Sequence, residues 1–354
     1  MKKITVKLGA NSYPVFIGAE LGKLGRFLRA GGFSRNALII TNPKVGKLYL
    51  SAVSRGLKSS GFRAGACVIP DGERFKTLDT VKKIYSAMLK AGLDRRSPVI
   101  ALGGGVVGDI SAFAASTFMR GLPVIQVPTT LLSMVDSSVG GKTGVDLTEG
   151  KNLVGSFHQP KAVWIDLGTL KTLPRNELRN GLAETIKYGI IRDAQLFKYI
   201  ERTIFKMPKS FEYVVSACCK IKAEVVSKDE FERKGLREIL NYGHTFGHAV
   251  ETLTNYRSYS HGEAVAVGMN IAARLAVKLK MLGESDAARI ECLLFNAWLP
   301  TRIEKKLSAD KILTAMMRDK KTLNGKLRLV LPVSIGKVTV KTGVPVETIK
   351  GVLK

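Results

Sequence analysis

The stretch LREILNYGHTFGHAVETLTNYRSYSHGE, residues 236–263, contains three of the four histidines of this chain. His244 and His248 are four residues apart, so a helix would place them one turn apart on the same face. His261 follows after a polar loop. Two helical histidines alone are as typical of a partly buried, hydrogen-bonded pair as of a metal site. The third histidine, together with a helical carboxylate elsewhere, favours a metal site.

The residues around the histidine pair extend this expectation. We expect Arg237 and Asn241 to lie on the same helix, within two turns before the pair, where they supply a cation and an amide. Glycines 243, 247 and 262 would let the backbone come close to the imidazoles. A zinc protease needs a Glu directly after the first histidine as its general base, and this chain has none there. The pattern therefore excludes a zinc protease.

Length and composition indicate a folded protein of two domains. The chain has 354 residues, a length greater than one ordinary hydrophobic core requires, and 45% of the residues are hydrophobic. No window is long and apolar enough for a bilayer span, and the N-terminus lacks the apolar run of a signal peptide. We therefore expect a cytoplasmic protein without a membrane partner. The four scattered cysteines form no C-x-x-C pair, so neither a disulfide framework nor a thiolate metal site is indicated.

The formal net charge of +27 is unusual, because 56 Lys and Arg face only 29 Asp and Glu. It has two interpretations: one is nucleic-acid binding, and the other is surface charge that reflects a basic proteome as a whole or that attracts small anions. The basic residues are spread over the whole length, no basic run is interleaved with aromatic residues, and only 7% of residues are aromatic. We therefore favour solvated surface charge and expect no specific nucleic-acid partner.

The N-terminal half has the pattern of a parallel α/β sheet. Segments at residues 4–8 and 13–17 predict an opening antiparallel pair. Short apolar runs then alternate with helical stretches, which is typical of parallel strands. The expected strands cover residues 37–41, 66–70, 98–102, 123–127 and 162–166, and one expected helix covers residues 75–91. Ligands of such sheets bind at the carboxyl ends of the strands.

Glycine-rich loops follow two of these strands. Gly103–Asp109, GGGVVGD, leads into a helix whose first N–H groups could bind a phosphate; the alternative is a simple tight turn. It matches G-x-G-x-x-G, but it follows a late strand, and no acid for a ribose comes about twenty residues later. Gly141-Lys142-Thr143 lacks the first P-loop glycine, so nucleotide-triphosphate hydrolysis is not supported. Lys142, Lys151 and Asn152 remain candidate anion contacts, against the commoner role of solvent-facing side chains.

The sequence becomes helical after residue 166. The segment at residues 175–188, RNELRNGLAETIKY, has helical spacing, with Glu184 and Lys187 three residues apart. A helical Glu is exposed by default, but apolar neighbours make Glu184 the carboxylate candidate for the metal site. The helical pattern continues to Asp319 and ends in a strand-like segment at residues 326–332. We expect a nucleotide-binding α/β domain with a parallel sheet at residues 1–170 and an all-α metal-binding domain at residues 171–354.

A series of motifs, in order along the chain, resembles the 3-dehydroquinate synthase family of the sugar phosphate cyclase superfamily. The motifs are DGERFK, GGGVVGD, ASTFMRG, PTTLLSMVDSSVGGKTGVD, GKNLVGSFHQP, DLGTLKTLP, LAETIKYG, GLREILNYGHTFGHAVE and HGEAVAVGM. The resemblance extends from about residue 40 to about residue 330. It implies an NAD-binding α/β domain, a helical metal- and substrate-binding domain and a homodimer. The implied cofactors are NAD and a divalent metal ion, zinc or cobalt.

The resemblance also implies roles for individual residues. The implied metal ligands are Glu184, His244 and His261. The implied NAD contacts are Asn42, Asp71, Gly72, Glu73, Lys76, Gly104, Gly105, Val106, Val107, Gly108, Asp109, Thr129, Thr130, Lys142, Lys151, Thr169, Leu170, Lys171 and Thr172. The implied catalytic and substrate contacts are Lys142, His248, Asn241, Arg237, Lys222, Lys187, Asn152, Asp136 and Arg120. Lys222 and Arg237 would hold the substrate carboxylate, Arg120 would come from the second subunit, and Lys320 or Lys321 would close the site.

The implied reaction converts 3-deoxy-D-arabino-heptulosonate 7-phosphate into 3-dehydroquinate and phosphate, a step of the shikimate pathway. It comprises transient oxidation by NAD, phosphate elimination, re-reduction, ring opening and intramolecular aldol closure, so the dinucleotide is retained. The segment at residues 229–235 departs from the family pattern in length or polarity. This departure affects the expected placement of Lys222, which precedes the segment.

Three alternatives stay open. A cyclase for sedoheptulose 7-phosphate would not need Lys222 and Arg237, because that sugar has no carboxylate. A metal-dependent polyol dehydrogenase would accumulate NADH. A polyanion-binding protein would bind DNA at physiological salt and would need no metal.

Overall fold

The computed structural model describes residues 1–206, 211–255, 257–303, 307–318 and 327–353. The chain forms two compact units: unit 1 comprises Met1–Pro174 and Cys218–Phe231, and unit 2 comprises Arg175–Ala217 and Glu232–Lys354. Helix α8 (Phe211–Lys228) is divided between the units. In the described part of the chain, no helix is long and apolar enough to cross a membrane. The expected assignment of NAD to residues 1–170 and of metal and substrate to residues 171–354 stays a prediction.

Among its described residues, unit 1 contains a seven-stranded sheet in the order β1-β2-β9-β6-β5-β3-β4. These strands are β1 (Lys2–Val6), β2 (Tyr13–Ile17), β3 (Asn36–Thr41), β4 (Arg63–Val68), β5 (Val99–Gly103), β6 (Val124–Pro128) and β9 (Ala162–Ile165). β1 pairs with β2 antiparallel, and every other neighbouring pair is parallel. The predicted α/β sheet with its opening antiparallel pair is confirmed, with small shifts at the strand ends.

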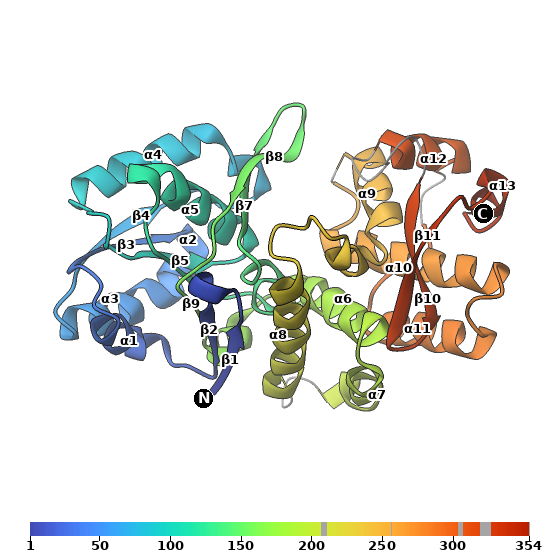
Figure 1. Cartoon of the computed structure of the whole chain (residues 1–354), viewed down its shortest axis with the longest axis horizontal. Coiled ribbons are helices and arrows are strands. Elements are labelled where there is room, and N and C mark those ends of the chain that lie inside the picture. Colours follow the sequence, from blue (N-terminus) through green and yellow to red (C-terminus); the bar gives the residue numbers. More distant parts are fainter. Residues whose placement is uncertain (207–210, 256, 304–306, 319–326, 354) are drawn as a thin grey trace. The chain divides into compact units, whose positions relative to one another are not determined.

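Helices cover both faces of this sheet (Figure 1). They are α1 (Leu24–Ala30), α2 (Pro43–Val45), α3 (Ser51–Ser59), α4 (Leu78–Lys90) and α5 (Gly105–Thr117). Neighbouring residues of β3 point to opposite faces, so Leu38 packs in the cluster with α4 and α5 while Ile39 packs in the cluster with α1 and α3. Because both faces are covered, β5, β6 and β9 are buried along their whole length. Each fully buried aliphatic side chain of this kind contributes about 1.5–3 kcal/mol to the free energy of unfolding.

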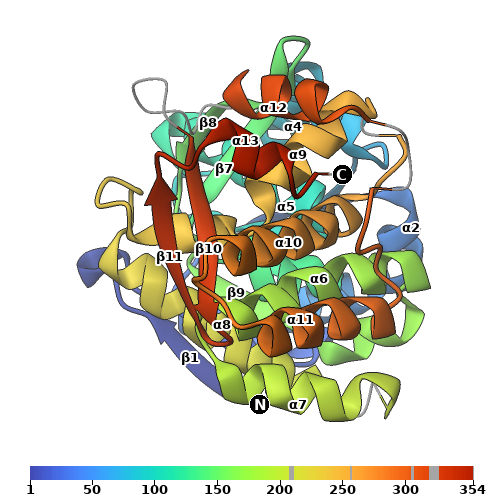
Figure 2. The same cartoon turned by 90° about the vertical axis from the view of Figure 1, so that its right-hand side faces the viewer.

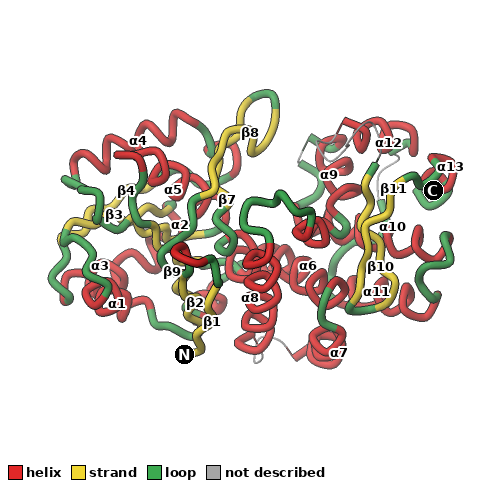
Figure 3. Tube along the Cα trace, viewed as in Figure 1, coloured by secondary structure: helices red, strands yellow, loops and turns green. Residues whose placement is uncertain are grey.

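The carboxyl ends of the parallel strands carry the loops predicted to bind NAD. β3 leads into Asn42 and α2, β5 into Gly104 and α5, and β9 into η7 (Leu167–Thr172). β6 leads through η6 (Ser133–Ser137) into a separate two-stranded ribbon of β7 (Lys142–Leu147) and β8 (Gly150–Phe157), which Figure 3 shows in yellow. Since parallel strands end at the same edge of a sheet, these loops gather at one edge of unit 1.

Unit 2 consists mainly of helices arranged around α10. Its helices are α6 (Arg175–Ile191), α7 (Ala194–Thr203), η8 (Ile204–Lys206), η9 (Leu236–Asn241), α9 (His244–Leu253), α10 (His261–Lys278), α11 (Glu284–Asn296), α12 (Ala309–Arg318) and α13 (Val346–Lys350). α10 is buried along most of its length and packs against α6, α9, α11 and β10 (Figure 2). A hairpin of β10 (Arg328–Ser334) and β11 (Lys337–Thr342) accompanies the helices. Unit 2 is therefore helical as predicted, but it is not all-α.

The predicted continuous helix from Arg237 to the histidine pair is wrong. η9 ends at Asn241, and α9 begins at His244. Between them, Tyr242 has a ψ of 127° and Gly243 has a φ of 81°, a left-handed conformation that glycine adopts at little cost. The hydroxyl of Tyr242 donates a hydrogen bond of 2.8 Å to a backbone oxygen of α10, which fixes the break. Arg237 and Asn241 therefore lie on a separate turn that precedes α9.

Candidate functional site

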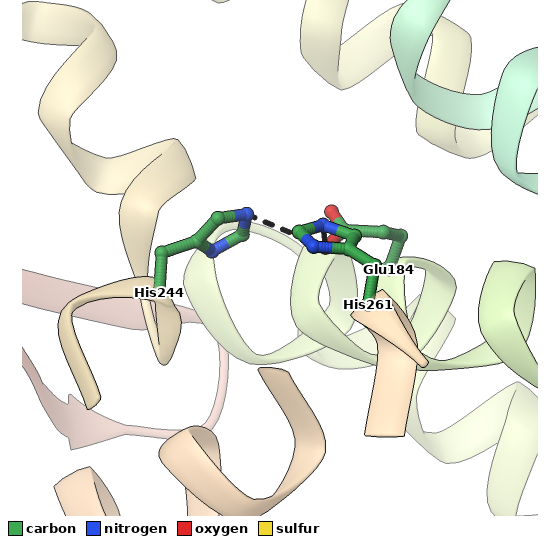
Figure 4. Close-up of side chains that lie close together, drawn as sticks. All are labelled: Glu184, His244 and His261. Atoms are coloured by element: carbon green, nitrogen blue, oxygen red, sulfur yellow. Dashed lines mark ion pairs between the residues drawn. The ribbon is translucent and has the colours of Figure 1, made fainter. Parts of the chain in front are cut away.

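Three predicted ligands converge in unit 2. Glu184 lies in the middle of α6, His244 is the first residue of α9, and His261 is the first residue of α10. One donor atom of each lies within 4.8 Å of the others. The Nε2 atoms of His244 and His261 are 3.6 Å and 3.9 Å from Oε1 of Glu184. Figure 4 shows the two imidazoles and the carboxylate coming together from separate elements.

Glycines let the three helices approach closely enough for this arrangement. A Cβ on Gly262 would lie 2.6 Å from Cα of Asn180 in α6, and a Cβ on Gly268 would overlap the backbone oxygen of Gly243. The side chain of Asn180 also accepts a hydrogen bond of 3.1 Å from the N–H of Gly262, which ties the start of α10 to α6. A Cβ on Gly243, Gly247 or Gly262 would meet a neighbouring helix, whereas the predicted approach of these glycines to the imidazoles stays a prediction.

The carboxylate of Glu184 is 0% exposed, and its Oε1 accepts no hydrogen bond. The ammonium of Lys187, one turn later and also buried, forms an ion pair with Oε2. The other oxygen faces two imidazole nitrogens, and buried charges of this kind are paired or coordinate metals. One carboxylate oxygen and two imidazole nitrogens are ligands that zinc and cobalt accept. The residues present therefore fit a divalent metal ion.

The second nitrogen of each imidazole also contacts the protein. Nδ1 of His244 is 3.2 Å from the backbone oxygen of Tyr242, and Nδ1 of His261 is 3.4 Å from Oε1 of Glu251. Burial lowers the pKa of His261, but the hydrogen bond and charge of Glu251 and the charge of Glu184 outweigh burial and raise the pKa above its ordinary value. Sequence reasoning missed Glu251. The feature of the sequence that could have identified Glu251 is its position seven residues, or two helical turns, after His244.

His248 lies beside the converging ligands rather than among them. Its ring centre is 5.4 Å from that of His244 and 6.4 Å from that of His261. Within the described residues, the converging donor atoms belong to Glu184, His244 and His261. The predicted role of His248 as a substrate or ligand contact stays a prediction.

In unit 1, the ends of β3 and β4 bring together two predicted NAD contacts. The amide of Asn42 donates a hydrogen bond of 2.8 Å to Asp71, and its oxygen accepts from the backbone of α2. Lys44 forms an ion pair with the same Asp71 at 2.8 Å. Sequence reasoning missed Lys44, although its place two residues after Asn42, at the start of a helix, could have drawn attention to it.

A second cluster joins three loops of unit 1. Nζ of Lys76 lies 2.6 Å from Oδ2 of Asp109 and 2.6 Å from Oδ1 of Asn152. Burial lowers the pKa of Lys76, but Asp109 and Glu73 outweigh burial and raise the pKa. Burial raises the pKa of Asp109, against the charge and hydrogen bond of Lys76. Glu73 also approaches Lys151 at 3.9 Å. The predicted residues in this cluster are thus in contact with one another.

The first turn of α5 lies at the carboxyl end of β5. Gly104 is the N-cap of this 13-residue helix, and Gly105 is its first residue. The N–H of Thr129 donates to the backbone oxygen of Gly103 at 2.9 Å, so the loops after β5 and β6 are adjacent. A helix N-terminus of this kind suits a phosphate. The other predicted NAD contacts of this region are Val106, Val107, Gly108 and Thr130; the side chain of Val107 is buried in the core, which leaves its backbone for a contact.

The last predicted NAD contacts, Thr169, Leu170, Lys171 and Thr172, lie on η7. The hydroxyl of Tyr49 donates to the backbone oxygen of Thr169 at 3.3 Å and is hydrogen-bonded to Thr172. Leu170 is buried, so its side chain serves the core. Tyr49 was not predicted, because no motif marks it and only the fold brings it to η7.

Predicted substrate contacts also occur in unit 1. Nζ of Lys222, on the part of α8 that belongs to unit 1, donates to Oδ1 of Asp136 at 2.7 Å and to its backbone oxygen at 2.5 Å. Arg120 and the preceding Met119 both have left-handed backbones, with φ values of 67° and 47°. Two successive strained residues often mark a functional loop. Lys142 is the first residue of β7.

The remaining predicted substrate contacts belong to unit 2 or lie outside the described residues. Arg237 is buried on η9, and Asn241 is the last residue of the same turn. The predicted partners Lys222 and Arg237 therefore belong to different units. Lys320 and Lys321 lie outside the described residues. The roles predicted for all these residues stay predictions.

Two family models match adjoining parts of the chain. The model of the 3-dehydroquinate synthase N-terminal domain matches residues 66–180, and the model of the C-terminal domain matches residues 181–322. A relative from Desulforamulus reducens, named 3-dehydroquinate synthase, is 47% identical over 358 aligned residues, which cover 100% of this chain and 99% of the relative.

Two solved structures are similar over the whole chain. The 2-epi-5-epi-valiolone synthase of Streptomyces hygroscopicus subsp. jinggangensis, solved with NAD+ and Zn2+, has a TM-score of 0.86 and 30% identity and covers 100% of this chain and 97% of its own. A 2-deoxy-scyllo-inosose synthase, solved with carbaglucose-6-phosphate, NAD+ and Co2+, has a TM-score of 0.86 and 27% identity and covers 99% of both chains.

Proposed function

Because this chain belongs to the 3-dehydroquinate synthase family, we propose that it converts 3-deoxy-D-arabino-heptulosonate 7-phosphate into 3-dehydroquinate and phosphate. The observation that carries the proposal is the convergence of Glu184, His244 and His261 in a chain that matches this family along its length. The proposed cofactors are NAD and a divalent metal ion, zinc or cobalt.

Glu184, His244 and His261 would hold the metal ion. A divalent ion bound by three protein ligands supplies a positive charge that polarises a substrate oxygen. The ion pair between Lys187 and Oε2 of Glu184 holds that carboxylate so that Oε1 faces the imidazoles. His248, whose ring lies beside those of His244 and His261, would donate a hydrogen bond to the substrate.

The loops at the carboxyl ends of the parallel strands would bind NAD. NAD supplies a transient acceptor for a hydride. The N–H groups at the start of α5 would bind its pyrophosphate, since they are unpaired within the helix and lie at the positive end of its dipole. Lys76 is engaged with Asp109 and Asn152, so it fixes the shape of the neighbouring loops. Because the hydride returns to the substrate, no NADH should accumulate.

Lys142, Arg120 and Asn152 would stabilise the charge of the leaving phosphate. Cations and amide donors that are already in position lower the barrier to such a step more than mobile groups do. The departing phosphate would itself accept the proton that is removed from the carbon next to the transient ketone. Lys222 and Arg237 would bind the substrate carboxylate, and this requirement distinguishes the proposed substrate from sedoheptulose 7-phosphate.

The proposed enzyme is a cytoplasmic homodimer in which Arg120 of each chain completes the site of the other. The strained backbone at Met119 and Arg120 supports a functional loop at this position. Sedimentation of the purified protein tests the dimer, and mixed dimers test the shared site. Combining an Arg120→Ala chain with a His244→Ala chain should recover part of the activity, whereas no recovery would exclude a residue shared between subunits.

The substrate assignment is tested by comparing two sugar phosphates. Purified protein, supplied with zinc and a trace of NAD, should release phosphate from 3-deoxy-D-arabino-heptulosonate 7-phosphate and form 3-dehydroquinate. Lys222→Met should reduce this activity strongly, whereas Lys228→Met, an exposed lysine on the same helix, should not. Turnover of sedoheptulose 7-phosphate instead, or oxidation of glycerol with accumulation of NADH, would contradict the proposal.

A further inference from the structure

A buried carboxylate lies behind one of the two imidazole ligands. Nε2 of His261 faces Oε1 of Glu184 at 3.9 Å, and Nδ1, on the other side of the ring, lies 3.4 Å from Oε1 of Glu251. Glu251 is 5% exposed. It lies on α9 seven residues after His244, so two turns of one helix separate it from the other imidazole ligand.

The two imidazoles use their nitrogens in the same way but have different partners. Nε2 of both faces Glu184, and Nδ1 of both faces a protein oxygen. For His244 this oxygen is the neutral carbonyl of Tyr242, whereas for His261 it is a carboxylate. An acceptor at Nδ1 places the hydrogen on that nitrogen and leaves Nε2 free to donate its electron pair to a metal. A carboxylate also makes the imidazole a stronger ligand than a carbonyl does.

We propose that Glu251 is a positioning residue that orients His261 and strengthens its bond to the metal ion. This inference rests on the proposed metal site at Glu184, His244 and His261. Among the described residues, Glu251 is not one of the converging donors. It acts through His261, by fixing the angle of the ring and the nitrogen that carries the hydrogen. A buried carboxylate that served only the fold would have no reason to influence metal affinity.

The experiment measures metal affinity rather than turnover. Metal-free wild-type protein and the variants Glu251→Gln and Glu251→Ala are titrated with zinc against a chelator of known affinity. Glu251→Gln keeps an oxygen acceptor and removes the charge, and we expect roughly tenfold weaker zinc binding; Glu251→Ala removes both, and we expect a loss of up to roughly 100-fold. With cobalt in place of zinc, the visible absorption bands of both variants should shift, because the ligand field of His261 changes.

Two control variants separate the possible failures. Glu201→Gln removes an acidic charge elsewhere in unit 2, where Glu201 pairs with Arg289 at 2.7 Å, and it should bind zinc like the wild type. His244→Ala removes a proposed ligand and should abolish tight binding. If His244→Ala weakens zinc binding but both Glu251 variants stay within about twofold of the wild type with unchanged cobalt spectra, the role of Glu251 is wrong and the metal site stands. If His244→Ala binds zinc normally, the metal site itself is wrong. If Glu251→Ala does not fold, the zinc affinity and cobalt spectrum of Glu251→Gln alone decide whether Glu251 has the proposed role.

Discussion

The carboxylates of the predicted sites in unit 1 and unit 2 have different partners. In unit 1, lysines 44, 76 and 222 each pair with a carboxylate at 2.6–2.8 Å. In unit 2, one oxygen of Glu184 pairs with Lys187, and the other faces two imidazoles whose Nε2 atoms are, like that oxygen, electron-pair donors. Opposite charges in unit 1 hold loops together, whereas converging donors in unit 2 call for a metal ion. Substitutions in the Lys76 cluster of unit 1 should therefore cost stability, and substitutions of the converging ligands in unit 2 should cost metal binding.

The largest effect is expected for His244→Ala. Loss of a ligand removes a metal contribution of several kcal/mol to the transition state, so activity should fall by about 1000-fold or more. The thermal unfolding midpoint of the metal-free protein should stay close to that of the wild type. His158→Ala, which removes the histidine of unit 1, should leave zinc binding unchanged. Full activity of the His244 variant would remove the basis for the metal site.

Lys76→Met should lower stability and leave zinc binding unchanged, which is the opposite of the pattern expected for His244→Ala. It leaves the carboxylate of Asp109, which is 25% exposed, without its ion-pair partner. Breaking a buried pair costs about 3–5 kcal/mol, and the partial exposure of Asp109 places the expected loss near the lower value. Zinc affinity should not change. Lys82→Met is the matched control, because its pair with Asp79 is exposed and should contribute less than about 1 kcal/mol. Chemical denaturation and zinc titration of both variants would show whether stability and metal binding separate as expected.

Gly262→Ala should weaken both stability and zinc binding, because this glycine sets the distance between α6 and α10. Its added Cβ would meet backbone atoms of Asn180, so the start of α10 and His261 must move. We expect a loss of about 1–3 kcal/mol in the free energy of unfolding, together with weaker zinc binding. Gly22→Ala serves as control, since its Cβ would meet nothing within 4 Å. Unchanged zinc affinity in the Gly262 variant would show that the helix spacing does not position the ligand.

The smallest effect concerns His158, the histidine of unit 1. Burial lowers its pKa below the ordinary value of 6.5, with a smaller opposing contribution from its hydrogen bond to the backbone of Leu122. The unfolded chain thus binds this proton more readily than the folded protein. The contribution of His158 to stability is full above pH 6.5 and is lost as the pH falls below that value toward the lowered pKa. Metal-free His158→Gln should therefore lose less stability than the wild type between about pH 8 and about pH 5, as measured by chemical denaturation. Equal losses would contradict a neutral, buried His158.

The sequence allowed much of this arrangement to be predicted, because periodicity and motif spacing reflect local structure. The strand pattern anticipated the parallel sheet, and the apolar surroundings of Glu184 anticipated its burial. The break at Gly243 was missed, since a histidine pair at helical spacing gives no sign that the helix begins only at the first of them.

Other features could not be predicted because they depend on tertiary packing. Tyr49 reaches η7, and Glu251 reaches His261, through contacts between elements that no local pattern connects. The division of α8 between the two units likewise follows from packing, because the periodicity of a single helix does not reveal which unit each of its ends joins.

The most direct test is to measure phosphate and 3-dehydroquinate released from 3-deoxy-D-arabino-heptulosonate 7-phosphate with less NAD than substrate, before and after removal of metal. We predict many turnovers per NAD without accumulation of NADH, loss of activity on chelation, and recovery with zinc or cobalt. Turnover that survives complete removal of metal, or NADH that accumulates in proportion to product, would contradict a metal-dependent synthase that returns its hydride to the substrate.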